Sequence, residues 1–187
     1  MITKKQPKKI LLKSGRIIDP FSKKTFIGDI LIKNGSIASI RKTISSRDKD
    51  TLKIDCKGLV VTHGFCDIHA HFREPGREDK ENLKSGSIAA LAGGFTQVCT
   101  MPNTNPSIDS AEHIYYICGK SNHLPIDIFP IGAVSKGQKG KELTEMILMK
   151  ENGAIAFSDD GIPIQNAQFM ALALQYAKMI DLPIINH

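Results

Sequence analysis

Two histidines separated by one residue, His69 and His71, stand at the end of an apolar run over residues 59–65. Side chains at positions i and i+2 of a β-strand point to the same face, so these imidazoles would project side by side. Imidazole is a good zinc ligand, and a catalytic zinc site keeps one coordination position open for water. The pair therefore indicates a metal site, although a His-x-His pattern alone is weak evidence.

Two later segments also place metal-compatible side chains directly after short apolar runs. Asp159-Asp160-Gly161 follows residues 154–157, and His187 follows Pro183-Ile184-Ile185-Asn186. In a barrel of parallel strands, the carboxyl ends of the strands form the face on which active sites are built. The three segments together favour one metal-dependent site on that face.

The elements that must position these residues differ between two parts of the chain. Within residues 1–58, short strand candidates occur at 10–12, 16–18, 29–32, 36–40 and 51–55. Asn34-Gly35 between two alternating runs is a strong hairpin signal. We expect a small antiparallel β-sandwich segment here, in which residues 1–9 form a flexible basic arm.

From residue 59 onwards, strand and helix patterns alternate about every 30 residues, as in the βα units of a parallel sheet. Strands are predicted at 59–72, 95–101, 126–134, 154–157 and 183–186. Helices are predicted at 79–92, 110–119, 141–152 and 166–179, with Ser110 as an N-cap. An eight-fold barrel needs about 250 residues, so we expect residues 59–187 to form the N-terminal half of a (β/α)8 barrel. An open five-stranded sheet is the alternative, and a chain that ends on a candidate ligand favours the half-barrel.

Composition argues against several other classes of protein. The formal net charge is +6, but four positive charges fall within the first nine residues, without the aromatic residues or motifs of a nucleic-acid-binding segment. No apolar run approaches the ~20 residues of a membrane span, and no secretory signal follows the lysines. The four cysteines form no Cys-x-x-Cys pair, which favours reduced thiols in the cytoplasm. We expect neither nucleic acid nor membrane as a partner.

Three long motifs carry a resemblance to a known family. They are HAHFREPG (69–76), KENLKSGSIAALAGGFTQVCTMPNTNP (80–106) and AFSDDGIPIQ (156–165). Together they resemble the bacterial type I dihydroorotases of the amidohydrolase superfamily. The resemblance implies a zinc-dependent, reversible conversion of dihydroorotate to N-carbamoyl-aspartate in pyrimidine synthesis. His63 stands where such proteins usually have proline, a change expected to alter only the turn that enters the first barrel strand.

Carried over position by position, the resemblance assigns roles to individual residues. The implied ligands of one or two zinc ions are His69, His71, Asp160 and His187. The implied substrate-binding residues are His71, Arg73 and Asn103, and a fork-shaped guanidinium suits recognition of a carboxylate. The resemblance places the general base, an aspartate, and a further histidine ligand beyond His187. The chain as given is therefore expected to be an incomplete, inactive fragment without a catalytic residue of its own.

Other functions stay open at this level. Asp159-Asp160 stands where dihydropyrimidinases place a lysine that becomes carboxylated, and Arg73 suits an acidic substrate, so both features favour dihydroorotase over an allantoinase- or hydantoinase-like amidase. A non-catalytic dihydroorotase-like subunit that supports aspartate transcarbamoylase is a third hypothesis. The resemblance also makes a transcarbamoylase a candidate partner and a homo-oligomer the expected state.

Each candidate residue also has a plainer interpretation. Arg73 and Glu74 could form a loop ion pair, Asn103 could serve only as a turn former, and Asp and Gly favour turns at residues 159–161. His187 could be a frayed side chain without a ligand role in this chain.

Overall fold

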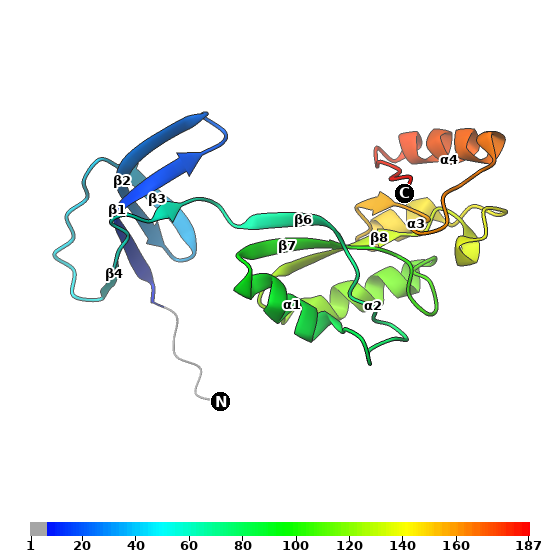
Figure 1. Ribbon diagram of the computed structural model, residues 1–187, viewed down its shortest axis with the longest axis horizontal. Coiled ribbons are helices and arrows are strands. Elements are labelled where there is room, and N and C mark those ends of the chain that lie inside the picture. The colour runs from blue at the N-terminus through cyan, green and yellow to red at the C-terminus, as the bar shows by residue number, and fades with distance from the viewer. Residues whose placement is uncertain (1–6) are drawn as a thin grey trace. The chain divides into compact units, whose positions relative to one another are not determined.

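Alternating apolar and polar residues fold the N-terminal part of the chain into one five-stranded sheet (Figure 1). The computed structural model describes residues 7–187, which divide after His63 into two units. The strands of the first unit are β1 (Lys9–Asp19), β2 (Lys24–Lys33), β3 (Ser36–Arg41), β4 (Thr51–Asp55) and β5 (Val60–Val61). Their order is β3-β2-β1-β4, with β5 also paired to β1.

The first sheet is antiparallel over β1, β2 and β3, whereas β4 and β5 run parallel to β1. Asn34 and Gly35 have φ values of 50° and 80°, so the hairpin predicted at this dipeptide is confirmed. Residues 42–50 are long enough to cross the sheet, and β4 therefore enters parallel to β1 rather than antiparallel. The five strands share one hydrogen-bonded sheet, and the sandwich stays a prediction.

A buried carboxylate explains why two strands predicted separately form the single strand β1. The register of β1 against β2 shifts around Ser14, whose φ is 59°. Asp29 accepts hydrogen bonds from Ser14 N at 2.8 Å, Ile44 N at 2.7 Å and Lys13 Nζ at 2.5 Å. The carboxylate thus gives the Ser14 N–H a hydrogen-bond acceptor where the strand is irregular, so β1 continues through the bulge.

The predicted basic arm falls partly outside the described residues, because residues 1–6 are not among them. Lys9 belongs to β1, and its ammonium group pairs with the carboxylate of Asp48. The end of the predicted arm is thus part of the sheet.

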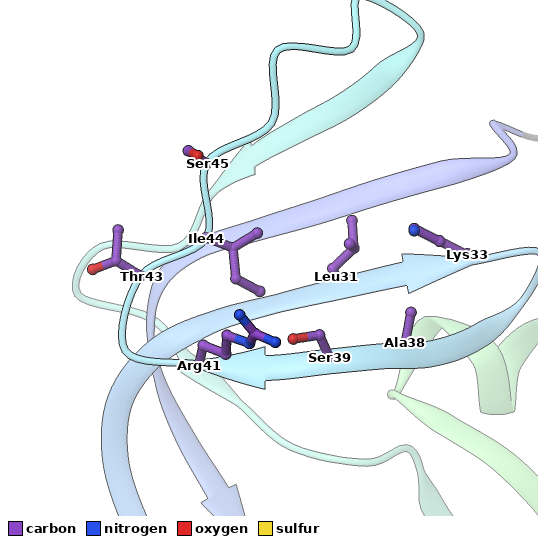
Figure 2. Close-up of a pocket in the computed structure, with 8 residues that line it drawn as sticks. All are labelled: Leu31, Lys33, Ala38, Ser39, Arg41, Thr43, Ile44 and Ser45. Carbon is purple, nitrogen blue, oxygen red and sulfur yellow. The ribbon is translucent and has the colours of Figure 1, made fainter.

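A cavity of about 420 Å³ lies in the first unit, between β2, β3 and the segment that follows β3 (Figure 2). It is lined by Leu31, Lys33, Ala38, Ser39, Arg41, Thr43, Ile44 and Ser45. No histidine, cysteine or carboxylate is among these lining residues. The cavity therefore lacks the ligand types of a metal centre.

The second unit contains a parallel sheet in the order β6-β7-β8-β9. Its strands are β6 (Phe65–Ala70), β7 (Phe95–Thr100), β8 (Asp127–Gly132) and β9 (Ala156–Phe157). Its helices are α1 (Leu83–Ala92), α2 (Ala111–Ser121), α3 (Met146–Glu151) and α4 (Ala167–Met179), with a 3-10 turn, η1, at Lys136–Gln138. The predicted alternation of strands and helices around a parallel sheet is confirmed.

Several boundaries differ from the predicted ones because of a helix cap or of pairing with another strand. The helix predicted from residue 79 begins at Leu83, because the Asn82 side chain caps it by accepting from Ser85 N at 2.9 Å. The strand predicted over 59–72 is interrupted, since Val60–Val61 pairs with β1 and only Phe65–Ala70 joins β7. The N-cap predicted at Ser110 is confirmed by its side chain, which accepts from His113 N.

The third helix and the last strand are also shorter than predicted. Leu143 forms an antiparallel bridge with Ser135, so the helix predicted over 141–152 begins only at Met146. The predicted strand 183–186 reduces to a parallel bridge between Ile184 and Phe157.

The main core lies where the helices of the second unit pack on the parallel sheet. Its most buried members include Val98, Ile114, Ile117, Met146, Met149 and Phe157. A second, smaller cluster contains Cys99, Met101, Ile131 and Ala156. In the described part of the chain, no helix is long and apolar enough to cross a membrane.

Candidate metal centre

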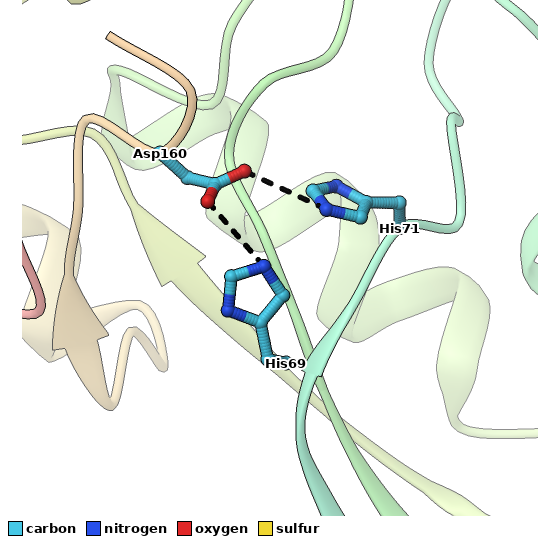
Figure 3. Close-up of side chains that lie close together, drawn as sticks. All are labelled: His69, His71 and Asp160. Atoms are coloured by element: carbon cyan, nitrogen blue, oxygen red, sulfur yellow. Dashed lines mark ion pairs between the residues drawn. The ribbon is translucent and has the colours of Figure 1, made fainter. Parts of the chain in front are cut away.

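The second unit gathers two histidines and one carboxylate at the carboxyl ends of its strands (Figure 3). His69 lies in β6, His71 follows that strand, and Asp160 follows β9. The distances are 3.3 Å from His69 Nε2 to Asp160 Oδ1 and 3.6 Å from His71 Nε2 to Asp160 Oδ2. Their candidate ligand atoms all lie within 4.8 Å of one another, which is close enough to bind one ion.

His187 lies beside this group as well. Its Nε2 is 3.6 Å from Asp160 Oδ1, and its ring centroid is 4.8 Å from that of His69. The bridge between Phe157 and Ile184 places the end of the chain there. The four residues that the sequence suggested as ligands therefore lie together, although His187 is 65% exposed.

Asp160 provides the clearest sign that the group fits a cation. Its side chain is only 3% exposed, and its Oδ1 accepts no hydrogen bond from the described residues. An unpartnered, buried carboxylate oxygen is costly, and a cation among imidazoles would compensate its charge. Imidazole nitrogen with carboxylate oxygen is a donor set that zinc and related divalent metals accept. The residues present thus fit a metal ion.

Asn103 joins His71 to Asp160. The Asn103 amide donates from Nδ2 to Asp160 Oδ2 at 2.8 Å, which leaves its Oδ1 to accept. His71 Nδ1 lies 2.9 Å from that oxygen and must therefore be the protonated nitrogen. The lone pair of a neutral His71 then lies on Nε2, the atom that faces Asp160. Asn103 thus orients a candidate ligand.

Asp159 has a different role from that of its neighbour Asp160. Its Oδ1 accepts from Val134 N at 2.8 Å and Ser135 N at 3.1 Å, and its Oδ2 accepts from the Ser135 hydroxyl. Burial raises the pKa of Asp159, although these hydrogen bonds oppose the rise. Asp159 ties the segment after β9 to the segment after β8, which leaves Asp160 as the residue that faces the histidines.

Two residues near Asp160 have no signal in the sequence pattern. Ser135 binds Asp159, and Gln138 donates from Nε2 to the Asp160 carbonyl at 3.3 Å. Both lie in the loop after β8, more than twenty residues before Asp160 in the chain. Only the pairing of β8 with β9 brings them to the site.

The structure contradicts the interpretation of Arg73 and Glu74 as a loop ion pair. Glu74 is buried and pairs instead with Lys120 of α2, with Nζ 2.5 Å from Oε1. Arg73 has a left-handed φ of 32°. Among the described residues 7–187, its guanidinium has no hydrogen-bond or ion-pair partner, which leaves its donors available.

Solved structures with this architecture define the class of the fold. The chain superposes on L-hydantoinase from Arthrobacter aurescens with a TM-score of 0.78 at 22% identity, over 95% of this chain and 40% of the other. For dihydropyrimidinase from Brevibacillus agri, the TM-score is 0.71 at 19% identity, over 94% and 39%. The second unit therefore shares the fold of these hydantoinase-type structures, with a curled parallel sheet that forms half of a barrel.

Sequence comparison places the chain within that class. A family model described as dihydro-orotase-like matches residues 58–187, and the chain belongs to this family. It is 45% identical to the dihydroorotase of Solibacter usitatus and 46% to that of Caldicellulosiruptor saccharolyticus, each over 95% of this chain. The dihydroorotase of Aquifex aeolicus is 43% identical over 96%. The chain spans 41% to 42% of the length of these relatives.

Proposed function

We propose that this chain is the N-terminal portion of a dihydroorotase, which interconverts (S)-dihydroorotate and N-carbamoyl-L-aspartate in pyrimidine biosynthesis. The observation that carries the proposal is the buried Asp160 carboxylate, whose Oδ1 accepts no hydrogen bond from the described residues and faces His69 and His187. Family membership and relatives that carry the name dihydroorotase support the same substrate.

Zinc is the metal that we assign to this site, held by His69, His71, Asp160 and His187 as one ion or two. When bound, zinc would lower the pKa of a water molecule and polarise the ring carbonyl. Asp160 would supply the compensating negative charge from a buried position. Asn103 would keep the Nε2 lone pair of His71 available, because its Oδ1 accepts a hydrogen bond from Nδ1–H.

In this proposal, Arg73 is the residue that selects the substrate. Dihydroorotate carries a carboxylate that uncharged cyclic amides lack, and a guanidinium can bind a carboxylate through two parallel hydrogen bonds. Arg73 follows His71 by two residues, and its guanidinium has no competing partner within the described chain. This combination favours an acidic ring over the uncharged rings of hydantoinase-type enzymes.

The remaining parts of the enzyme stay predictions. No residue of this chain is assigned as the general base, which we expect on the part of the protein beyond His187 together with a further histidine ligand. A homo-oligomer and an aspartate transcarbamoylase partner are also predicted from the resemblance, and a cytoplasmic location is predicted from the scattered cysteines.

Replacing Arg73 in the complete protein tests the assignment of substrate. Arg73→Met should raise KM for dihydroorotate by about 30-fold, because a charge-assisted bidentate contact is lost. Zinc content, measured by elemental analysis, should not change. Arg77→Met is the matched control, since Arg77 lies in the same loop and pairs with exposed Asp79. Loss of zinc from the Arg73 variant would contradict a substrate-binding role.

A further inference from the structure

Glu74 is a charged residue buried beside the segment that carries the candidate ligands. Its side chain is only 6% exposed, although it immediately follows Arg73 in a loop. Burial of a carboxylate is unfavourable unless donors surround it. Glu74 therefore has a structural or functional reason to point into the protein.

Three donors from two helices satisfy this carboxylate. Oε2 accepts from Leu83 N at 2.8 Å, at the first residue of α1. Oε1 accepts from the Tyr116 hydroxyl at 3.0 Å and from Lys120 Nζ at 2.5 Å, both on α2. Burial alone would raise the pKa of Glu74, but these hydrogen bonds outweigh it and hold the pKa below its usual value. The group is thus an anion fixed between α1 and α2.

Lys120 is itself held in place within this cluster. Its Nζ lies 4.8 Å from the centroid of the Tyr116 ring, a cation–π geometry. Half of its side chain is exposed, so Lys120 can be replaced without opening the core.

Arg73 lies between two buried anchors. Phe72 is 8% exposed and packs so closely on α1 that a Cβ at Gly86 would lie 2.7 Å from its ring. On the other side, Glu74 is held by α2. With both neighbours fixed, the backbone of Arg73 keeps a left-handed φ of 32°, which an L-residue adopts only when its surroundings enforce it.

We propose that Glu74, through its contacts with Lys120 and Tyr116, is a positioning residue that holds Arg73 in the conformation needed to bind the substrate carboxylate. This inference rests on the proposed function, because it assigns a substrate contact to Arg73. It extends the site from the strand ends to α2, 46 residues away in the sequence.

The test uses the complete protein and the variants Glu74→Gln, Lys120→Met and Tyr116→Phe. Each variant weakens the contacts between Glu74 and α2 and leaves the candidate metal ligands unchanged. Lys120→Met should raise KM for dihydroorotate by about tenfold and leave kcat within about threefold, because only substrate binding is weakened. Lys120→Arg should restore most of the affinity. Tyr115→Phe and Glu151→Gln are matched controls on exposed positions and should behave like the unmodified protein.

A second measurement tests the contacts of Glu74 with α2 and does not depend on turnover. Amide hydrogen exchange in residues 72–78 should be faster in Lys120→Met and in Glu74→Gln, while zinc content stays unchanged. Faster exchange in a protein that does not convert dihydroorotate would support the anchor and reject the proposed function. Turnover with unchanged KM and unchanged exchange in Lys120→Met would overturn the inference, even if Glu74→Gln fails to fold.

Discussion

At the scale of single residues, the site depends on how hydrogen bonds are shared around Asp160. One of its carboxylate oxygens accepts from Asn103, whereas the other has no donor among the described residues and faces two histidines. Asn103 also fixes which nitrogen of His71 carries the hydrogen. The amide therefore prepares both an imidazole and a carboxylate for a cation, as residues next to metal ligands commonly do.

Removing this amide should weaken metal binding. We expect Asn103→Ala to lower the zinc affinity of the complete protein by about tenfold or more, as loss of a hydrogen-bonded neighbour of a ligand does. Competition with a chelator measures the effect. Asn122→Ala, at the exposed C-cap of α2, should leave the affinity unchanged. Equal zinc affinity in the Asn103 variant would contradict the orienting role.

At this scale, the sequence pattern predicted which metal-compatible side chains lie together, whereas their role as ligands stays a prediction. His69, His71 and Asp160 follow apolar runs at strand ends, a pattern that can be read directly. The contact between Glu74 and Lys120 could not be found in this way, because it depends on how α2 packs beside the loop after β6. The contacts of Asn103 with both His71 and Asp160 could not be predicted either, because they depend on how close the ends of separate strands lie.

At the scale of elements, caps and tight turns were the most predictable features. Asn34-Gly35 forms its hairpin and Ser110 caps its helix, because both signals act within a few residues. The short helix α3 was less predictable, since the bridge from Ser135 to Leu143 competes with helix formation. The Asn82 cap sets the start of α1 locally, whereas pairing with other segments decides the break in the predicted strand 59–72 and the short α3.

The loops after β6 and β7 approach each other closely at one glycine. Gly76 has a φ of 94°, and a Cβ there would lie 1.8 Å from Asn105 O. Asn105 N donates to Pro75 O at 3.1 Å, so the two loops are also joined by a hydrogen bond. This contact ties the segment after His71 to the segment that carries Asn103.

Adding a methyl group at this position should be destabilising. Gly76→Ala should lower the free energy of unfolding by about 2 kcal/mol or more, from the clash and the left-handed backbone together. Gly119→Ala in α2 is the contrasting control, because a Cβ there meets nothing within 4 Å. That change should stabilise by about 0.5–1 kcal/mol, since alanine favours helix. Denaturant unfolding measures the free energy of unfolding of both variants. If the Gly76 and Gly119 variants were equally stable, the two loops would have to separate readily.

At the scale of the whole molecule, the alternation of strands and helices identified the half-barrel, and three motifs identified the family. Both inferences agree with the fold of the hydantoinase-type structures and with the dihydro-orotase-like family model. The first sheet was harder to predict, because β4 reaches its parallel position beside β1 only through the long connection over residues 42–50. The sequence periodicity alone does not specify such crossovers.

Substrate discrimination by the complete, zinc-loaded protein tests the central claim most directly. Steady-state rates should be measured with dihydroorotate and with dihydrouracil, the same ring without the carboxylate. We predict that kcat/KM for dihydroorotate exceeds that for dihydrouracil by at least about 100-fold, since the carboxylate contact is charge-assisted. Equal rates, or a preference for dihydrouracil, would contradict a dihydroorotase and assign the site to a cyclic amidase of uncharged rings.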